Sequence, residues 1–469
     1  MAWKRSSFIA LFLIFGLVAP VFADSKQIKK LKKSIAKAAA AENESEILGL
    51  MRELADIEDE DATEALYDVG LAHATTPKSY EEVLKLLGRK DGMLTFLSER
   101  YGKIKNKGDF RERVYIVDIT AAVPGGDAVT QLGTYLDDKS SFVQGASVDH
   151  LAASMTREAI GPLITLLEKL NKKRRDVTYH QVRDALWTLT GQDFEVIEDW
   201  IAWWEPNSRS FDPKASDHEA KTGVARKRRG DDPDFWGVPV ESKNIVFVID
   251  TSGSMRYVMK IDIPGLGRGD GSDGGGSSGG GPMTPEDRRL AEFWTRMEMA
   301  KRELVRVVKK LGKDAFFNCV RFDSTTSKFL KKAQPATNGN KKKAFKWIEG
   351  IRHKGNTSTM EALQQAFNAD ARTNTIYFLS DGLPSKDGKN NDATRPILDK
   401  LFELNRFRKI KIHTFGFDPV PFPDPGNSQP NPDLVEANKW LKELAEATGG
   451  KFTIMKVDTK RTPDNPDGE

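Results

Sequence analysis

The stretch 245–255 constrains the fold of this 469-residue chain more than any other. It opens with an unbroken apolar run of β-branched and aromatic residues at 245–249, and it stops abruptly in Asp250-Thr251-Ser252-Gly253-Ser254. An apolar run without polar alternation is typical of a strand buried on both faces, as at the centre of a parallel sheet. Open α/β sheets bind ligands at the carboxyl ends of their strands. The stretch therefore predicts a central strand whose polar turn lies at a binding rim.

Strand patterns and helix patterns alternate after this turn. Expected strands lie at 244–249, 315–323, 326–332, 375–379, 410–417 and 452–455, and expected helices at 286–311, 341–351, 358–369, 393–407 and 432–447. Such alternation predicts a doubly wound, mainly parallel sheet with helices on both faces. We assign this α/β domain to residues 242–458, with a Gly-rich insertion at 256–284 and a disordered tail at 459–469.

The region 24–205 is expected to be entirely α-helical. It is rich in Ala, Glu, Lys and Leu, with apolar residues at helical spacing. The segment 126–132 matches the segment 157–163, and a third copy begins near Val182. A repeat of about thirty residues built from two helices is typical of an α-solenoid, and this stretch resembles HEAT-type repeats. An ordinary helical bundle is the alternative, and the polar segment 206–241 is expected to be a charged linker.

Residues 1–23 resemble a secretion signal. Lys4 and Arg5 precede an apolar run at 8–18, and small residues at 21–23 suit a cleavage site. We expect an exported protein of the periplasm or cell surface, or a secreted one, without a membrane span once the signal is removed. An uncleaved N-terminal anchor is the alternative. The chain carries a net charge of +4, and removal of the signal lowers it to +2, which does not favour nucleic acid or anionic lipid as a partner.

The residue types that carry most enzyme chemistry are sparse. The six histidines show no metal-ligand spacing, and no nucleophile with a partnered base is evident. The single cysteine, Cys319, lies in a strand-like run and is expected to be a buried core residue. We therefore do not expect an enzyme.

Three loops of the α/β domain carry oxygen side chains at strand ends or helix starts. The first supplies Asp250, Ser252 and Ser254, the second supplies Thr357, and the third supplies Asp381. In a parallel sheet these loops meet at one rim. Two carboxylates and three hydroxyls, without Cys or His, form a hard oxygen site that suits Mg²⁺, Ca²⁺ or Mn²⁺ and not zinc or copper.

The order Asp-x-Ser-x-Ser, Gly-x-Thr and Asp-Gly resembles the von Willebrand factor A family over about residues 242–457. The resemblance implies a metal-ion-dependent adhesion site with Mg²⁺ as the expected ion. Ser252 and Ser254 would bind the ion directly, and Thr357, Asp250 and Asp381 would bind it directly or through water. Two carboxylates only just neutralise a divalent ion, so an Asp or Glu carboxylate of a protein partner can complete its coordination.

Two alternatives bear on this site. The serines could cap a helix and the aspartates could form turns, although the insertion after Met255 leaves no long helix directly behind them. The insertion could also occlude the site, with Asp270 or Asp273 as an internal ligand. The expected function is metal-dependent protein binding, with the helical region as a second interaction surface. A non-catalytic regulatory or scaffold subunit of an envelope enzyme complex is the alternative.

Overall fold

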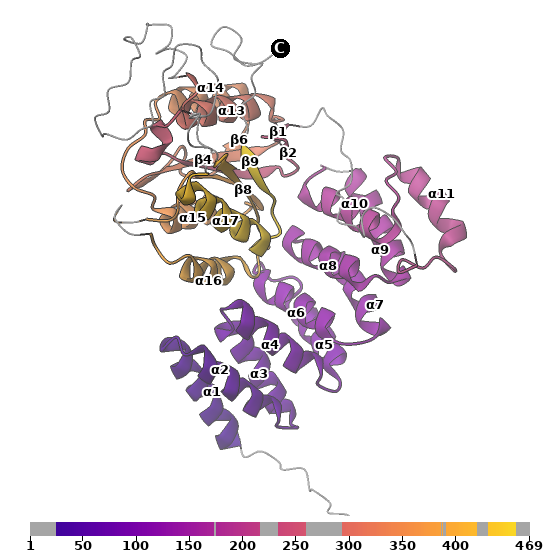
Figure 1. Cartoon of the computed structure of the whole chain (residues 1–469). Helices are drawn as coiled ribbons and strands as arrows, with labels where there is room; N and C mark the ends of the chain where they lie inside the picture. Colours follow the sequence, from indigo (N-terminus) through magenta and orange to yellow (C-terminus); the bar gives the residue numbers. More distant parts are fainter. Residues whose placement is uncertain are drawn as a thin grey trace, which may run out of the picture.

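The computed structural model describes residues 25–172, 175–215, 233–258, 293–385, 387, 391–419 and 430–455. A helical part precedes an α/β domain, and the two lie side by side (Figure 1). The helical part consists of α1 (Ser25–Ala40), α2 (Glu44–Ala55), α3 (Glu60–His73), α4 (Pro77–Gly88), α5 (Met93–Ile104), α6 (Arg111–Ala122), α7 (Gly126–Tyr135), α8 (Ser141–Ser154), η1 (Arg157–Ala159), α9 (Ile160–Asn171), α10 (Val177–Thr190) and α11 (Ile197–Asn207).

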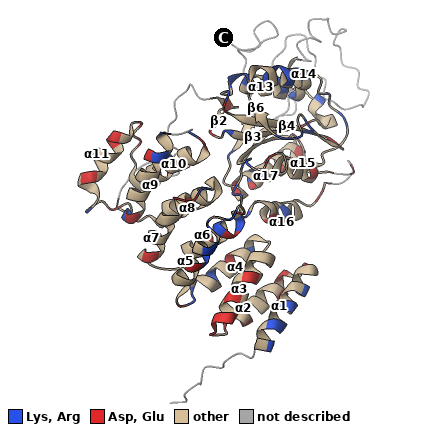
Figure 2. Ribbon diagram, turned by 180° about the vertical axis from the view of Figure 1, so that it is seen from behind, with Lys and Arg blue, Asp and Glu red and all other residues tan. Residues whose placement is uncertain are grey.

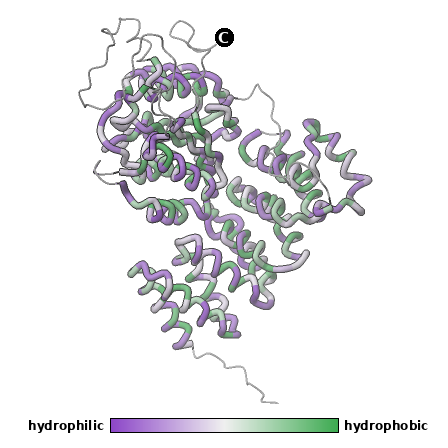
Figure 3. The backbone as a smooth tube through the Cα atoms, in the orientation of Figure 1, coloured by the Kyte–Doolittle hydropathy of each residue, from purple (hydrophilic) through white to green (hydrophobic). Residues whose placement is uncertain are grey.

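Helices of the first part stack in chain order. The helices α4, α6, α8 and α10 form one layer in which each contacts the next. The helices α5, α7 and α9 pack along one side of this layer. Both hydrophobic and hydrophilic segments recur along these helices (Figure 3), as amphipathic packing requires. Local sequence fixes several helix starts. At α4, the N-cap residue Thr76 and Ser79 form a reciprocal capping box, and Pro77 is the first residue of the helix. The expected all-helical region is confirmed, and its HEAT-like character stays a prediction.

The α/β domain contains one main sheet with strand order β5-β4-β3-β7-β8-β9, and β6 pairs with β4. β3, β4, β7, β8 and β9 are parallel, and β5 and β6 are short antiparallel strands on β4. The predicted doubly wound, mainly parallel sheet is therefore correct. Its elements are β1 (Asp234–Phe235), β2 (Val238–Pro239), β3 (Asn244–Asp250), η3 (Gly253–Arg256), α13 (Arg296–Lys310), β4 (Phe316–Phe322), β5 (Thr326–Lys328), β6 (Gln334–Pro335), α14 (Asn338–Glu349), α15 (Thr359–Phe367), β7 (Thr375–Leu379), α16 (Thr394–Asn405), β8 (Lys411–Phe417), α17 (Pro432–Ala447) and β9 (Phe452–Met455).

Both faces of β3 are buried, as its apolar run predicts. Ile245, Phe247 and Ile249 face a core shared with α13 and α14. Val246 and Val248 face a second core shared with α15, α16 and α17. Since side chains alternate along a strand, a strand covered by helices on both sides must be apolar at every position.

Two differences from the expected element bounds have local causes. The first helix of the domain begins at Arg296, where the Thr295 hydroxyl accepts a hydrogen bond from the Glu298 amide, and the expected start at 286 lies outside the described residues. The strand expected at 326–332 is shortened to β5 at the sheet edge. Residues 233–240 fall in the expected linker, yet β1 and β2 pair there and Phe235 is fully buried.

The helical part docks on the amino ends of the parallel strands. Arg406, just before β8, donates hydrogen bonds to the carbonyl oxygens of Leu71, at 2.9 Å, and Ala74. At the start of β3 the Lys243 amide donates to Asp176 at 2.8 Å. Phe407 of the α/β domain joins the hydrophobic core of the helical part. One side of the helical part is thus covered by the α/β domain of the same chain.

A buried aspartate lies at the centre of this interface. Asp118, on α6, accepts hydrogen bonds from Tyr80 at 2.7 Å and Lys409 at 2.9 Å, and it contacts the His150 ring nitrogen at 2.7 Å. Burial alone would raise the pKa of Asp118, but the charge of Lys409 and the bond with His150 outweigh it and hold this pKa well below its usual range. Lys409 comes from the α/β domain, so the ion pair crosses the interface.

Among the described residues, no helix combines the length and apolar character needed to span a membrane.

Candidate metal site

The first loop follows β3 directly and is held by hydrogen bonds from its own residues. The Ser252 amide donates to Asp250 Oδ1 at 2.7 Å, which folds the turn back onto the end of the strand. The Ser252 and Ser254 hydroxyl oxygens lie 3.0 Å apart. Asp250 is fully buried and Ser252 nearly so, whereas Ser254 is half-buried. The turn therefore presents two adjacent hydroxyls above a buried carboxylate.

The second loop is attached to the first through backbone contacts. The Gly253 amide donates to the Gly355 carbonyl at 2.9 Å. Gly355 has a φ of +69°, and a Cβ on it would lie 2.5 Å from the Ser324 hydroxyl oxygen, so only glycine fits here. Two residues on, the Thr357 hydroxyl oxygen lies 3.6 Å from where a Cβ on Gly382 would be. Thr357 is thus brought beside the third loop.

The third loop ends β7 and completes the cluster. The Ser254 hydroxyl donates to Asp381 Oδ1 at 2.7 Å, joining loops that lie 127 residues apart in the sequence. Asp381 is 4% exposed. The structure therefore brings all five residues expected from the sequence to one rim: Asp250, Ser252, Ser254, Thr357 and Asp381.

The two carboxylates of this rim are poorly compensated. Burial raises the pKa of Asp250, and the nearby Asp381 carboxylate raises it further. Hydrogen bonds from Ser380 and Ser252 lower the pKa of Asp250 only in part. A buried carboxylate whose charged form is disfavoured gains most from a nearby cation.

One internal cation already contacts the site. Arg296, the first residue of α13, donates from Nη1 to Asp381 Oδ2 at 2.7 Å. Its guanidinium carbon lies 5.4 Å from the ring centroids of both Tyr257 and Phe417. The Nε of Arg296 is buried and has no hydrogen-bond partner within the described structure. The arginine therefore neutralises one of the two carboxylates and leaves a net charge of −1.

Sequence reasoning missed three contributors to this rim. Ser380 donates to Asp250 Oδ2 at 2.5 Å, and its place directly before Asp381 could have identified it. The buried Asp323 accepts from Thr251 at 3.3 Å and ties the first loop to the end of β4. Arg296 carries no sequence signal, because an arginine at a helix start is commonplace and the chain between it and Asp250 holds the Gly-rich insertion.

The helix-capping alternative for the serines has little support. Up to residue 258, where the description of this segment stops, the four-residue turn η3 is the only helical element behind Ser252, and Ser252 makes no side-chain capping hydrogen bond there. Ser254 instead uses its hydroxyl on Asp381. Asp270 and Asp273, the expected internal ligands of the insertion, lie outside the described residues.

The donor set matches the chemistry of a hard divalent cation. Carboxylate and hydroxyl oxygens from three loops converge, and the charge of −1 that remains beside Arg296 is uncompensated. Groups of three or more His, Cys, Asp or Glu side chains suited to a metal are absent from the described part of the chain. Any ion here would rely on hydroxyls for most of its protein ligands, which agrees with Mg²⁺ and not with zinc.

Comparison with known proteins found similarity within the α/β domain. A family model described as von Willebrand factor type A domain matches residues 294–454. The human von Willebrand factor A domain-containing protein 3B is 28% identical over 159 residues, which are 34% of this chain and 10% of that protein. The chain thus spans about a tenth of the length of this curated relative.

Solved structures with partial similarity were also found. A von Willebrand factor type A protein from Catenulispora acidiphila is 15% identical with a TM-score of 0.30, over 47% of this chain and 41% of that one. The conserved hypothetical protein BatB from Bacteroides thetaiotaomicron is 16% identical with a TM-score of 0.28, over 46% of this chain and 91% of that one.

The matched range begins after the insertion and so leaves out β3 and its turn. In the structure β3 pairs along its whole length with β4, and it also pairs with β7, both of which lie inside the matched range. β3 and residues 250–254 therefore belong to the same sheet and the same fold. Residues 294–454 are thus similar to the von Willebrand factor type A domain, and a helical region precedes the α/β domain that contains them.

Proposed function

We propose that the carboxyl rim of the α/β domain binds a divalent cation, Mg²⁺ in the first place, with Ca²⁺ and Mn²⁺ as alternatives. Asp250, Ser252, Ser254, Thr357 and Asp381 would hold it. The observation that carries this proposal is the hydrogen-bonded path from Ser252 through Ser254 to Asp381, which lies above the under-compensated carboxylate of Asp250. Bound there, the ion would supply an electrophilic position for an outside ligand.

The bound ion would recruit an Asp or Glu side chain of a protein partner. The charges of the site support this assignment: two carboxylates, Arg296 and a divalent ion sum to +1, which one further carboxylate neutralises. In this proposal the ion serves to bind a partner and not to catalyse a reaction. We also propose that the protein lies outside the cytoplasm, with residues 1–23 as its export signal. These residues lie outside the described part of the chain.

Metal titration of the full chain tests the ion. An ion that binds only the folded state stabilises it, by about 2.7 kcal/mol at a hundredfold excess over Kd. We expect Mg²⁺ or Mn²⁺ to raise the melting temperature of the wild-type protein and calorimetry to give about one site. The Asp250→Ala variant should show neither effect. Asp370→Ala, at the opposite rim, is the matched control and should respond like the wild type.

Absence of any metal-dependent shift in the wild-type protein would refute the cation site. The partner is tested separately, by immobilising the chain and comparing capture of envelope proteins with and without chelator. Capture that persists both in chelator and with Asp250→Ala would leave the cation site standing and reject its role in partner binding.

A further inference from the structure

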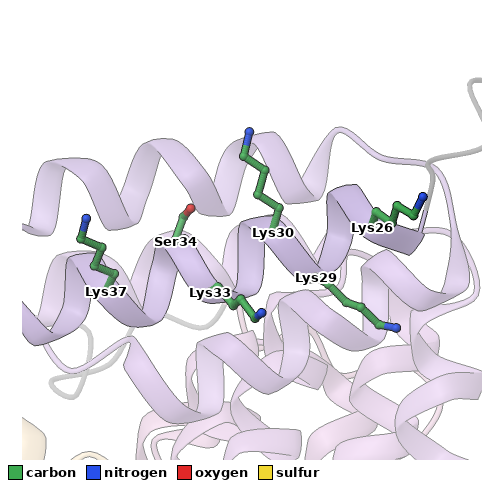
Figure 4. Close-up of a pocket in the computed structure, with 6 residues that line it drawn as sticks. All are labelled: Lys26, Lys29, Lys30, Lys33, Ser34 and Lys37. Atoms are coloured by element: carbon green, nitrogen blue, oxygen red, sulfur yellow. The ribbon is translucent and has the colours of Figure 1, made fainter.

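The first helix of the chain has a face of unusual charge. Ile28, Leu31, Ile35 and Ala38 of α1 are buried against the helical part. The opposite side is lined by five exposed lysines, here called the lysine face: Lys26, Lys29, Lys30, Lys33 and Lys37. Figure 4 shows these side chains along the helix, with Ser34 among them, around a shallow hollow of ≈ 430 Å³.

The excess positive charge of the whole protein resides in this one helix. The chain has a net charge of +4, and α1 contributes +6 because it contains six lysines and neither Asp nor Glu, so the remainder of the chain carries −2. Basic segments accordingly recur along α1 in Figure 2, whereas α3 carries acidic segments. The near-neutral overall charge therefore conceals a strongly basic surface at one end of the molecule.

This arrangement works against the helix itself. Lys26–Lys30, Lys29–Lys33 and Lys33–Lys37 are like-charge pairs at a spacing of four residues, which destabilise an isolated helix. Elsewhere the chain places opposite charges at this spacing, as in Glu81–Lys85. Lys32, at the edge of the face, forms an ion pair with Asp68 at 3.2 Å. A face kept merely for solubility would not need to exclude acids.

We propose that the lysine face docks on an anionic phospholipid surface. Its charges extend over about 16 Å of helix, the rise of eleven residues, and so match an extended array of phosphates better than a single ion. The apolar run 8–18 ends seven residues before α1 and brings this helix next to the membrane while that segment is retained. In Figure 1 α1 lies at the end of the helical part, and the candidate metal site lies at the rim of the α/β domain opposite the helical part, so docking leaves that site accessible.

Vesicle binding by the full chain tests this proposal. Each lysine near an anionic membrane multiplies the partition coefficient roughly fivefold, so loss of four should cost on the order of 10² to 10³. We expect wild-type protein to bind phosphatidylglycerol-containing vesicles more tightly than pure phosphatidylcholine vesicles, and 0.5 M salt to remove the difference. The quadruple variant Lys29→Gln, Lys30→Gln, Lys33→Gln, Lys37→Gln should bind both vesicle types equally. Neutral vesicles report the contribution of residues 1–23 in every protein.

Two further variants separate the lysine face from general charge and from misfolding. Replacing the same four lysines by arginine should preserve the preference for anionic vesicles. The control removes four exposed lysines from α13 and α14 and should keep the wild-type preference: Lys309→Gln, Lys310→Gln, Lys342→Gln and Lys343→Gln. An equal loss in this control, or an undiminished preference in the α1 variant, overturns the proposal. Selective competition by inorganic phosphate at matched ionic strength would instead indicate a discrete phosphate site and overturn it as well.

Discussion

The two ends of the same parallel sheet each hold a buried aspartate, and the two are compensated in opposite ways. At the amino end, Asp118 from the helical part contacts Lys409, His150 and Tyr80, and its pKa is held below the usual range. At the carboxyl end, Asp250 has only hydrogen bonds from Ser252 and Ser380 beside a like-charged neighbour, and burial raises its pKa.

This difference separates a structural carboxylate, Asp118, from the carboxylate that we propose as a metal ligand, Asp250. A buried charge with opposite charges around it stabilises the folded arrangement, and breaking such a pair is costly. A buried carboxylate beside another carboxylate destabilises the fold unless a cation is supplied. A carboxylate at a strand end whose pKa is raised by burial and by a like charge is typical of a functional site. The docking end fixes the two parts of the chain together, and the opposite rim is where we propose that a cation binds.

The largest expected effect is at the docking end. Asp118→Asn leaves Lys409 and His150 without their counter-charge. We expect the free energy of unfolding to fall by about 3 kcal/mol, the low end of the range for a broken buried pair. The low end applies because both partners are about one-third exposed. Since the pKa of Asp118 is depressed in the folded protein, the wild-type advantage should be full above pH 4 and shrink as the pH falls. Denaturant melts of both proteins between pH 3 and 7 measure it, and an advantage that grows on acidification contradicts the assignment.

The same substitution at the other end should have the opposite sign. Without metal, Asp250→Asn removes a like charge next to Asp381 and should stabilise the protein by roughly 1 kcal/mol, the worth of one pKa unit. With saturating Mg²⁺ the order should reverse, because only the wild type gains binding free energy. Thermal melts with chelator and with Mg²⁺ test both halves. Destabilisation of the chelated variant would mean that Asp250 is structural, like Asp118.

Removing the internal cation should strengthen metal binding. Arg296→Met eliminates the ion pair to Asp381, and a divalent ion then no longer competes with a charged hydrogen-bond donor. We expect Mn²⁺ affinity to rise roughly tenfold, equivalent to about 1.4 kcal/mol, measured by calorimetry. Arg306→Met, which removes a buried pair with Glu303 on the same helix, serves as the control and should leave the affinity unchanged. Weaker binding by Arg296→Met would show that the arginine supports the ion.

The smallest effect on metal affinity is expected at Thr357. Thr357→Val keeps the shape of the side chain and removes one hydroxyl ligand, so Mn²⁺ affinity should fall by about fivefold, or about 1 kcal/mol. Thr357→Ser keeps the hydroxyl and should retain most of the affinity. The hydroxyl is a ligand only if these two variants differ in calorimetric titrations.

Much of the fold could be predicted from local patterns. The apolar run at 245–249 required cover on both faces, and the alternation of strands and helices after it required a mainly parallel sheet. Because parallel strands point the same way, Asp250 and Asp381 had to meet at one rim, and Thr357, at the start of α15, lies there with them.

Other features could not be read in this way because they depend on how distant surfaces meet. Arg296 reaches Asp381 only through the packing of α13 against the sheet, and an arginine can pair in many ways. The ion pair between Asp118 and Lys409 joins residues 291 positions apart, one in the helical part and one in the α/β domain. Neither Asp118 nor Lys409 lies in a periodic pattern or a motif from which its partner could be predicted.

The sequence by itself determined a mainly parallel sheet and placed five oxygen-bearing side chains at its carboxyl rim, because periodicity and strand polarity are local properties. Tertiary structure alone decided that the helical part covers the opposite rim, that Arg296 neutralises one of the two carboxylates, and that the lysines of α1 form one outward face while its apolar side chains are buried. These depend on shape and on the summed electrostatics of packed surfaces, which no single segment encodes.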